Sequence, residues 1–219
     1  MWRGVANGSS SGQIRRTISI PGSWPVDWTT TLRATLGLTP ARKGKVVFDG
    51  EEVTRAPTHE IARRGLSWVP DDRRVFPSLT AERNLSIAQR KTRFEPWPVE
   101  RCCELFPALR HLLPRECENM SGGELQMVSI SRALVGAPGV MLLDEPSQGL
   151  APKVVQDVIR AMRTLKAQGV GMLVVDQNVR TVLAVADRVA VMRGGRIVHR
   201  VAAAALRDDA AERSKWLGG

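Results

Sequence analysis

Hydrophobic and polar positions follow a regular pattern from about Thr29 onward. Short apolar runs, bounded by glycine, proline or acidic residues, predict buried strands over 66–69, 139–143 and 171–175. Amphipathic patterns over 153–168 and 179–186 predict a helix after each of the last two strands. Continuously apolar strands that alternate with helices predict a largely parallel sheet with both faces covered.

Weaker patterns predict the remaining elements. Helices are expected over 29–38 and 59–64, a hairpin over 45–54, a second hairpin over 189–201 and a final helix over 202–216. The stretch from about 80 to 135 is predicted to be a helical subdomain, with Pro107 and Pro114 as breaks. The fold class is therefore α/β, with a mostly parallel sheet, a small antiparallel part and an inserted helical subdomain.

Residues 1–28 differ from the rest of the chain. They contain one acidic residue, Asp27, three of the six tryptophans and a linker-like run over 8–12, and they show no strand or helix period. We therefore expect an aberrant or poorly ordered segment over 1–28, followed by one domain over 29–219.

Composition narrows the possible classes of protein. No apolar run of the 219-residue chain reaches the ~18 residues that a membrane helix needs. The N-terminus has no apolar core of a secretory signal, and three cysteines cannot form a fully paired disulfide framework, so a reducing cytosol is expected. The net charge of +10 suggests nucleic acid or an anionic surface, but the arginines are scattered, which favours a plain compositional bias.

Two adjacent carboxylates, Asp144 and Glu145, follow the second predicted strand. In open α/β sheets ligands bind at the carboxyl ends of strands. Neighbouring side chains on a strand point to opposite faces, so the two carboxylates take different roles. Asp144 suits a magnesium ion that bridges phosphate oxygens, and Glu145 suits polarising an attacking water. A solvated turn after a core strand explains a lone Asp-Glu pair equally well.

The segment Ser121-Gly122-Gly123-Glu124 precedes a predicted helix. Ser121 and Glu124 have the spacing of a capping box, so Ser121 should begin the helix. The two glycines leave backbone N–H groups uncovered at the positive helix end, an arrangement that binds phosphate. A plain capped helix is the alternative.

The two motifs, in this order and about 20 residues apart, resemble those of the ATP-binding subunits of ABC transporters. Residues 121–124 are similar to the signature motif, 141–145 to the Walker B strand and 147–150 to the D-loop. The chain is most similar to an ATPase subunit of branched-chain amino-acid importers; the residues behind this narrower resemblance are 69–77, 144–152, 175–178 and 216–219. The resemblance implies a P-loop NTPase-like fold.

The resemblance also implies site residues and partners. The implied cofactors are ATP and Mg²⁺, and the implied partners are a second ATPase subunit in a head-to-tail dimer and membrane-spanning permease subunits. Such partners would place the chain at the cytoplasmic face of the plasma membrane. The implied catalytic residues are Glu145 and Gln177, the metal ligands Thr29, Asp71 and Asp144, and the nucleotide-binding residues Gly22, Thr29, Thr30, Ser121, Gly122, Gly123 and Glu124.

Two of these positions depart mildly from the family pattern. Asp71 stands where the family has the Q-loop glutamine, and a carboxylate can still bind magnesium. Gln177 stands at the switch histidine, which this branch of the family often replaces with glutamine. An amide can hydrogen-bond a phosphate but cannot carry a proton between pH 5 and 8.

The phosphate loop departs severely. The register of G-x-x-x-x-G-K-[ST] is occupied by Gly22 to Thr29, with Asp27 in place of the second glycine and Trp28 in place of the lysine. Losing such a charge-assisted contact costs roughly 1.5–3 kcal/mol before any repulsion from the aspartate. The sequence therefore predicts weak ATP binding through the chain's own loop.

Three explanations of residues 1–28 stay open. They are an out-of-frame segment joined to a normal body at Thr29, part of a truly degenerate ATPase, or a transit peptide. Two rival functions also stay open beside an importer ATPase. One is a catalytically impaired subunit that lends its signature motif to a competent partner. The other is a nucleic-acid-linked ABC ATPase, against which the chain shows no second ATPase domain, coiled-coil insertion or basic tail.

Overall fold

The structure is a computed structural model that describes residues 4–5, 17–19, 28–41 and 43–217. The chain divides into two compact units, which are described separately. The first comprises the described residues of Met1–Ile61 and Gln177–Gly219, and the second is Ala62–Asp176. No helix of the described residues combines the length and the apolar character that a membrane crossing requires.

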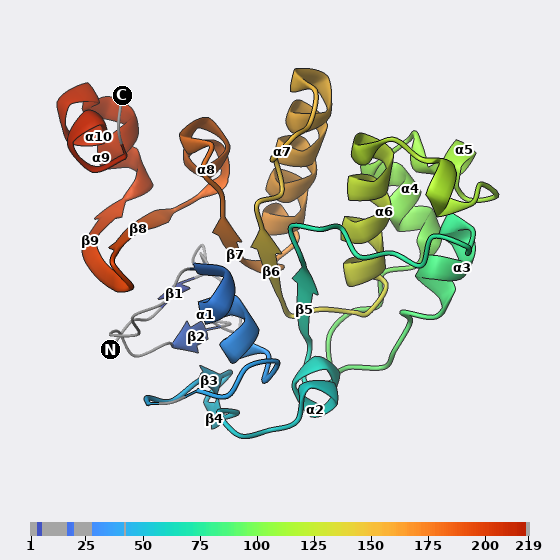
Figure 1. Cartoon of the computed structure of the whole chain (residues 1–219), viewed down its shortest axis with the longest axis horizontal. Coiled ribbons are helices and arrows are strands. Elements are labelled where there is room, and N and C mark those ends of the chain that lie inside the picture. The colour runs from blue at the N-terminus through green and yellow to red at the C-terminus, as the bar shows by residue number, and fades with distance from the viewer. Residues whose placement is uncertain (1–3, 6–16, 20–27, 42, 218–219) are drawn as a thin grey trace. The chain divides into compact units, whose positions relative to one another are not determined.

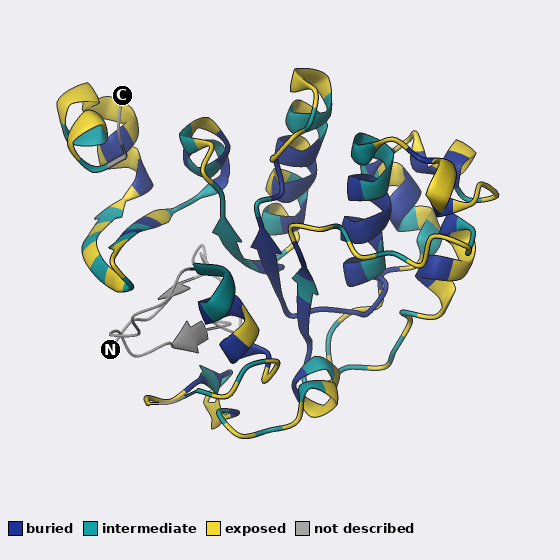
Figure 2. Ribbon diagram, viewed as in Figure 1, coloured by how far each residue is buried: buried dark blue, intermediate teal, exposed yellow. Residues whose placement is uncertain are grey.

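A parallel sheet forms the centre of the second unit. Its strands are β5 (Leu66–Val69), β6 (Val140–Asp144) and β7 (Gly171–Val175), in the order β5-β6-β7 (Figure 1). Every residue of β6 is buried (Figure 2), as its unbroken apolar sequence demands. Helix α7 (Pro152–Ala167) connects β6 to the parallel β7 and buries one apolar face. The three strands predicted from apolar runs are confirmed to within one residue.

Helices fill the insertion between the neighbouring strands β5 and β6. Helix α6 packs against β5 (Figure 1). The elements are α3 (Ala81–Ser86), α4 (Val99–Leu105), α5 (Leu109–Leu112), a 3₁₀ turn η1 (Cys117–Asn119) and α6 (Gly122–Leu134). The helical prediction for 80–134 is right in type. The residues between α3 and α4 are not helical, however, because Pro96 and Pro98 interrupt this stretch and Pro98 adopts an extended conformation before α4.

The N-terminal part of the first unit contains a small antiparallel sheet. Its strands are β1 (Gly4–Val5), β2 (Thr17–Ser19), β3 (Val47–Phe48) and β4 (Glu51–Glu52), in that order. Helices α1 (Trp28–Thr35) and α2 (Thr58–Arg63) belong to the same part of the chain. Strands β1 and β2 were not predicted, because two or three residues are too few for an alternating pattern to be recognised.

The C-terminal part of the first unit is a hairpin with helices around it. The elements are α8 (Val179–Val185), β8 (Arg188–Arg193), β9 (Arg196–Ala202), α9 (Ala203–Asp208) and α10 (Ala210–Leu217). Their buried side chains, including Leu183, Val189 and Leu206, form one cluster. The single helix predicted over 202–216 is wrong. Asp209 leaves the helical conformation, and its Oδ1 accepts hydrogen bonds from the N–H groups of Ala211 and Glu212, which begins a new helix.

Candidate functional site

The acidic end of β6 is built from a buried and a strained residue. Asp144 is fully buried as the last residue of the strand. Glu145 follows in the left-handed region, with φ of 48°, and its N–H donates to the Val175 carbonyl oxygen at 2.8 Å. A non-glycine residue in this conformation costs free energy and persists only where its surroundings hold it. The turn gives the two adjacent carboxylates different exposure, because Asp144 is buried whereas Glu145 is half-buried.

The strand register brings further acidic residues to the same edge of the sheet. Val69 pairs with Leu143, so Asp71 follows the end of β5 beside the acidic end of β6. Asp176 likewise follows β7. It accepts hydrogen bonds from the N–H of Ser147 at 3.1 Å and from its hydroxyl at 2.9 Å. Asp176 thereby joins the loop after β6 to the end of β7. The sequence around Asp176 did not predict this contact.

The N-terminus of α6 has the predicted capping box. Oε2 of Glu124 accepts hydrogen bonds from the N–H of Ser121 at 2.7 Å and from its hydroxyl at 2.8 Å, and Ser121 Oγ accepts from the Glu124 N–H at 3.4 Å. Gly122 and Gly123 form the first turn and are half-buried. The N–H groups of a first helical turn have no acceptor within the helix, so those of the glycines suit a phosphate.

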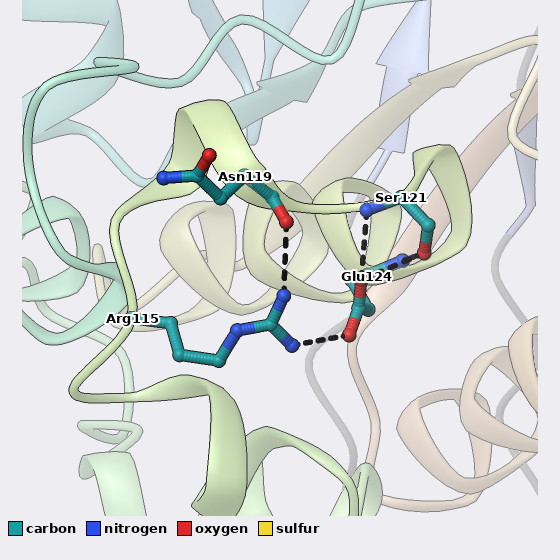
Figure 3. Close-up of polar contacts among 4 residues, drawn as sticks. All are labelled: Arg115, Asn119, Ser121 and Glu124. Carbon is teal, nitrogen blue, oxygen red and sulfur yellow. Dashed lines mark hydrogen bonds and ion pairs between the residues drawn. The ribbon is translucent and has the colours of Figure 1, made fainter.

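Arg115 holds this capping box from outside the helix (Figure 3). Its Nη1 lies 2.7 Å from Oε1 of Glu124, and its Nη2 donates to the Asn119 carbonyl oxygen at 2.9 Å. The hydrogen bond from the Ser121 backbone is the largest cause that lowers the pKa of the Glu124 carboxyl, and the Ser121 hydroxyl and Arg115 lower it further. The glutamate is therefore both turned back onto Ser121 and paired with a cation, which reduces its repulsion of a phosphate at the helix end.

The capping box should make stability depend on pH in one direction. The carboxyl pKa of Glu124 is lowered from 4.5 on folding, so the charged form stabilises the fold above about pH 4.5 and this contribution is lost as the pH falls further. Comparing Glu124→Gln with the parent protein, we expect a lower free energy of unfolding at pH 7, by about 0.5–1 kcal/mol. The difference should shrink below pH 4.5, as measured by urea unfolding. An equal difference at pH 7 and pH 3 would contradict the assignment.

The remaining predicted site residues lie in the first unit or outside the described residues. Thr29 and Thr30 are half-buried in the first turn of α1. Gln177 is exposed and precedes Asn178, whose side chain caps α8 by accepting from the N–H groups of Arg180 and Thr181. Gly22 and the predicted phosphate loop up to Asp27 lie outside the described residues.

The chemistry of the donors fits a magnesium ion that arrives with a phosphate ligand. Among the described residues, no three His, Cys, Asp or Glu side chains gather into a metal-binding group. Asp144 ends β6 and Asp71 follows the paired strand β5, and both side chains carry carboxylate oxygens. Mg²⁺ prefers oxygen, and it is commonly held by one or two carboxylates together with waters and substrate phosphates. A magnesium site at this edge therefore does not require a complete set of protein ligands.

A parallel sheet with an acidic strand end, together with a capped helix that begins with two glycines, fits an ATPase with a P-loop NTPase-like fold. Residues 16–148 match the family model described as ABC transporter, and the chain belongs to that family as an ATPase subunit of a transporter. The predicted fold class is thereby confirmed.

The chain is similar to ATP-binding proteins of different transport systems over most of its length. It is 38% identical over 192 residues to the high-affinity branched-chain amino acid transport ATP-binding protein BraG of Pseudomonas aeruginosa, covering 87% of this chain and 82% of the relative. It is 33% identical over 209 residues to the lipopolysaccharide export system ATP-binding protein LptB of Escherichia coli K12, covering 93% and 86%. The solved ATP-binding cassette MJ1267, in its ADP conformation, superposes with a TM-score of 0.69 at 24% identity over 88% of this chain and 84% of that one.

Proposed function

We propose that this chain energises the import of branched-chain amino acids by binding and hydrolysing MgATP. The observation that carries the choice of substrate is the 38% identity to BraG along 87% of the chain. The resemblance of residues 69–77 and 144–152 to importer ATPases supports the same choice. The substrate itself would be selected by the membrane subunits.

The proposed chemistry is the in-line attack of water on the γ-phosphate of ATP. Glu145 orients and polarises the water, and its fixed turn after β6 suits this task. Asp144, Thr29 and Asp71 are the proposed ligands of Mg²⁺, which would neutralise charge on the phosphates. Thr29, Thr30 and Gln177 are assigned from the order of the family's motifs, and Gln177 would hydrogen-bond the γ-phosphate.

The helix end at Ser121 to Gly123 is proposed to contact the ATP that is bound by a second ATPase subunit in a head-to-tail dimer. This dimer would bind permease subunits at the cytoplasmic face of the membrane. The backbone N–H groups of the first turn, which have no acceptor within the helix, and the ion pair of Glu124 with Arg115 support this role. The assignment also accommodates a weak phosphate loop, because the chain can complete a partner's site even if it binds its own ATP poorly.

A second candidate function is lipopolysaccharide export. The observation that favours it is the 33% identity to LptB of Escherichia coli over 93% of the chain, a longer match at lower identity than the one to BraG. Both candidates use the same ATPase chemistry and differ in the membrane subunits and the cargo.

Uptake in the source strain separates the two candidates. Deleting the coding sequence should abolish most ATP-dependent uptake of radiolabelled leucine, isoleucine and valine, and the intact chain should restore it. The Glu145→Gln variant should not restore uptake. Unchanged amino-acid uptake together with a loss of lipopolysaccharide from the cell surface would overturn import in favour of export.

A further inference from the structure

Arg73 joins three segments of the second unit. It lies two residues after Asp71, in the turn that follows β5. Its Nε donates to Oε1 of Gln126 in α6 at 3.0 Å, and its Nη2 donates to the carbonyl oxygen of Gln148, in the loop after β6.

The surroundings of Arg73 are shaped to receive its guanidinium. A Cβ on Gly122 would lie 2.7 Å from Nη1, so the first turn of α6 makes room for the arginine by having no side chain there. Gln126 is buried, and its Nε2 has no hydrogen-bond partner among the described residues, so the contact to Arg73 is a principal polar contact of this amide. The arginine adopts φ of 51°, a strained conformation that persists only where contacts hold it.

We propose that Arg73 is a positioning residue that couples the helix end at Gly122–Glu124 to the loop 146–150 after the acidic strand end. The planar guanidinium donates in a fixed fork, so one side chain can fasten both segments and transmit a displacement of either one to the other. A lysine has a single ammonium on a flexible stem and cannot reproduce that geometry.

The consequence of this coupling rests on the proposed function. In a head-to-tail dimer, the helix end of one chain faces the partner's nucleotide, whereas the acidic strand end of the same chain faces its own nucleotide. Arg73 therefore connects two nucleotide sites through one protomer. Loss of the connection should make the two sites act more independently, without removing any group that touches ATP.

The coupling can be tested on the full chain without nucleotide, by amide hydrogen exchange. Gly149 adopts φ of 65°, so Gly149→Ala strains the loop 146–150, while the added Cβ would lie 3.8 Å from Nη2 of Arg73 and would not collide with it. We expect this substitution to speed exchange of the amides at 121–126 by about three- to tenfold when Arg73 is present. In an Arg73→Gln or Arg73→Lys background, Gly149→Ala should add no further change there.

Arg74→Gln is the matched control, because Arg74 is the adjacent, exposed arginine and its Nε bonds Asp72 at 2.6 Å. In this background the effect of Gly149→Ala at 121–126 should persist. Thermal melts establish that each variant folds, and the Lys variant decides the result if the Gln variant does not fold. If Gly149→Ala speeds amide exchange at 121–126 equally with and without Arg73, the proposal is overturned.

Hydrolysis kinetics distinguish this inference from the proposed function. If the parent chain hydrolyses MgATP cooperatively, Arg73→Gln should lower its Hill coefficient toward one, and an unchanged coefficient would count against the link between the sites. If the parent chain neither binds nor hydrolyses MgATP, the proposed function fails, and the exchange experiment still decides whether Arg73 couples the two segments.

Discussion

Replacing Glu145 with glutamine should slow ATP hydrolysis by about a hundredfold to ten-thousandfold. The amide has nearly the same shape as the carboxylate but cannot draw a proton from the attacking water. The substitution leaves the backbone turn and its hydrogen bond to Val175 in place, so MgATP binding should be retained. Steady-state phosphate release at millimolar MgATP measures the first effect, and equilibrium binding of MgATP measures the second.

The control for this substitution is Glu104→Gln, an exposed glutamate in α4, within the helical insertion. That variant should hydrolyse ATP at the parent rate. Hydrolysis by Glu145→Gln at the parent rate would remove Glu145 from the role of orienting water. A parallel loss of MgATP binding would instead indicate that Glu145 supports the ligand and not the chemical step.

Local patterns in the sequence predicted the core of the second unit well. The apolar runs of β5, β6 and β7 are short and unbroken, and buried parallel strands require this composition. The capping box at Ser121 was predictable for the same reason, because its hydrogen bonds join residues three positions apart. Asp209 carries a comparable signal, since Glu212 follows three residues later, but the helical pattern around it obscured the break.

Contacts between distant positions were not predictable. Arg73 lies 53 residues from Gln126 and 75 from Gln148, and no periodic pattern relates such positions. The ion pair of Arg115 with Glu124 spans the 3₁₀ turn η1, and the bond of Ser147 to Asp176 depends on the pairing of β6 with β7. The left-handed turn at Glu145 is likewise set by its tertiary surroundings, because glutamate has no intrinsic preference for it.

The family match includes residues 16–28, which the sequence analysis treated as a separate segment. The family match begins at residue 16, on the N-terminal side of Thr29, whereas the motifs alone suggested that the similarity begins at Thr29. Strand β2 (Thr17–Ser19), which lies in this added range, pairs with β3. The register of the phosphate loop, from Gly22 to Thr29, falls inside the matched range. The segment Gly22 to Thr29 is therefore the place to test for a phosphate loop.

Restoring two residues of that loop should therefore strengthen ATP binding. The double substitution Asp27→Gly and Trp28→Lys converts the segment into a complete G-x-x-x-x-G-K-T motif. It removes a negative side chain from the phosphates and adds a charge-assisted donor, so the Kd for MgATP should fall by about tenfold to a hundredfold. Titration calorimetry with MgATP measures the change, and thermal melts establish that α1, which begins at Trp28, still folds.

The double variant Asp27→Gly with Trp28→Met distinguishes the effect of the lysine on MgATP affinity from the effect of the glycine. It relieves the aspartate and keeps an apolar side chain at the half-buried position 28, but it supplies no cation. Its affinity should fall between those of the parent and the lysine variant, because the charge-assisted contact to phosphate is missing. If the folded lysine variant binds MgATP no better than the parent, residues 22–29 do not form the phosphate loop. The chain would then contribute to catalysis only by completing a partner's site.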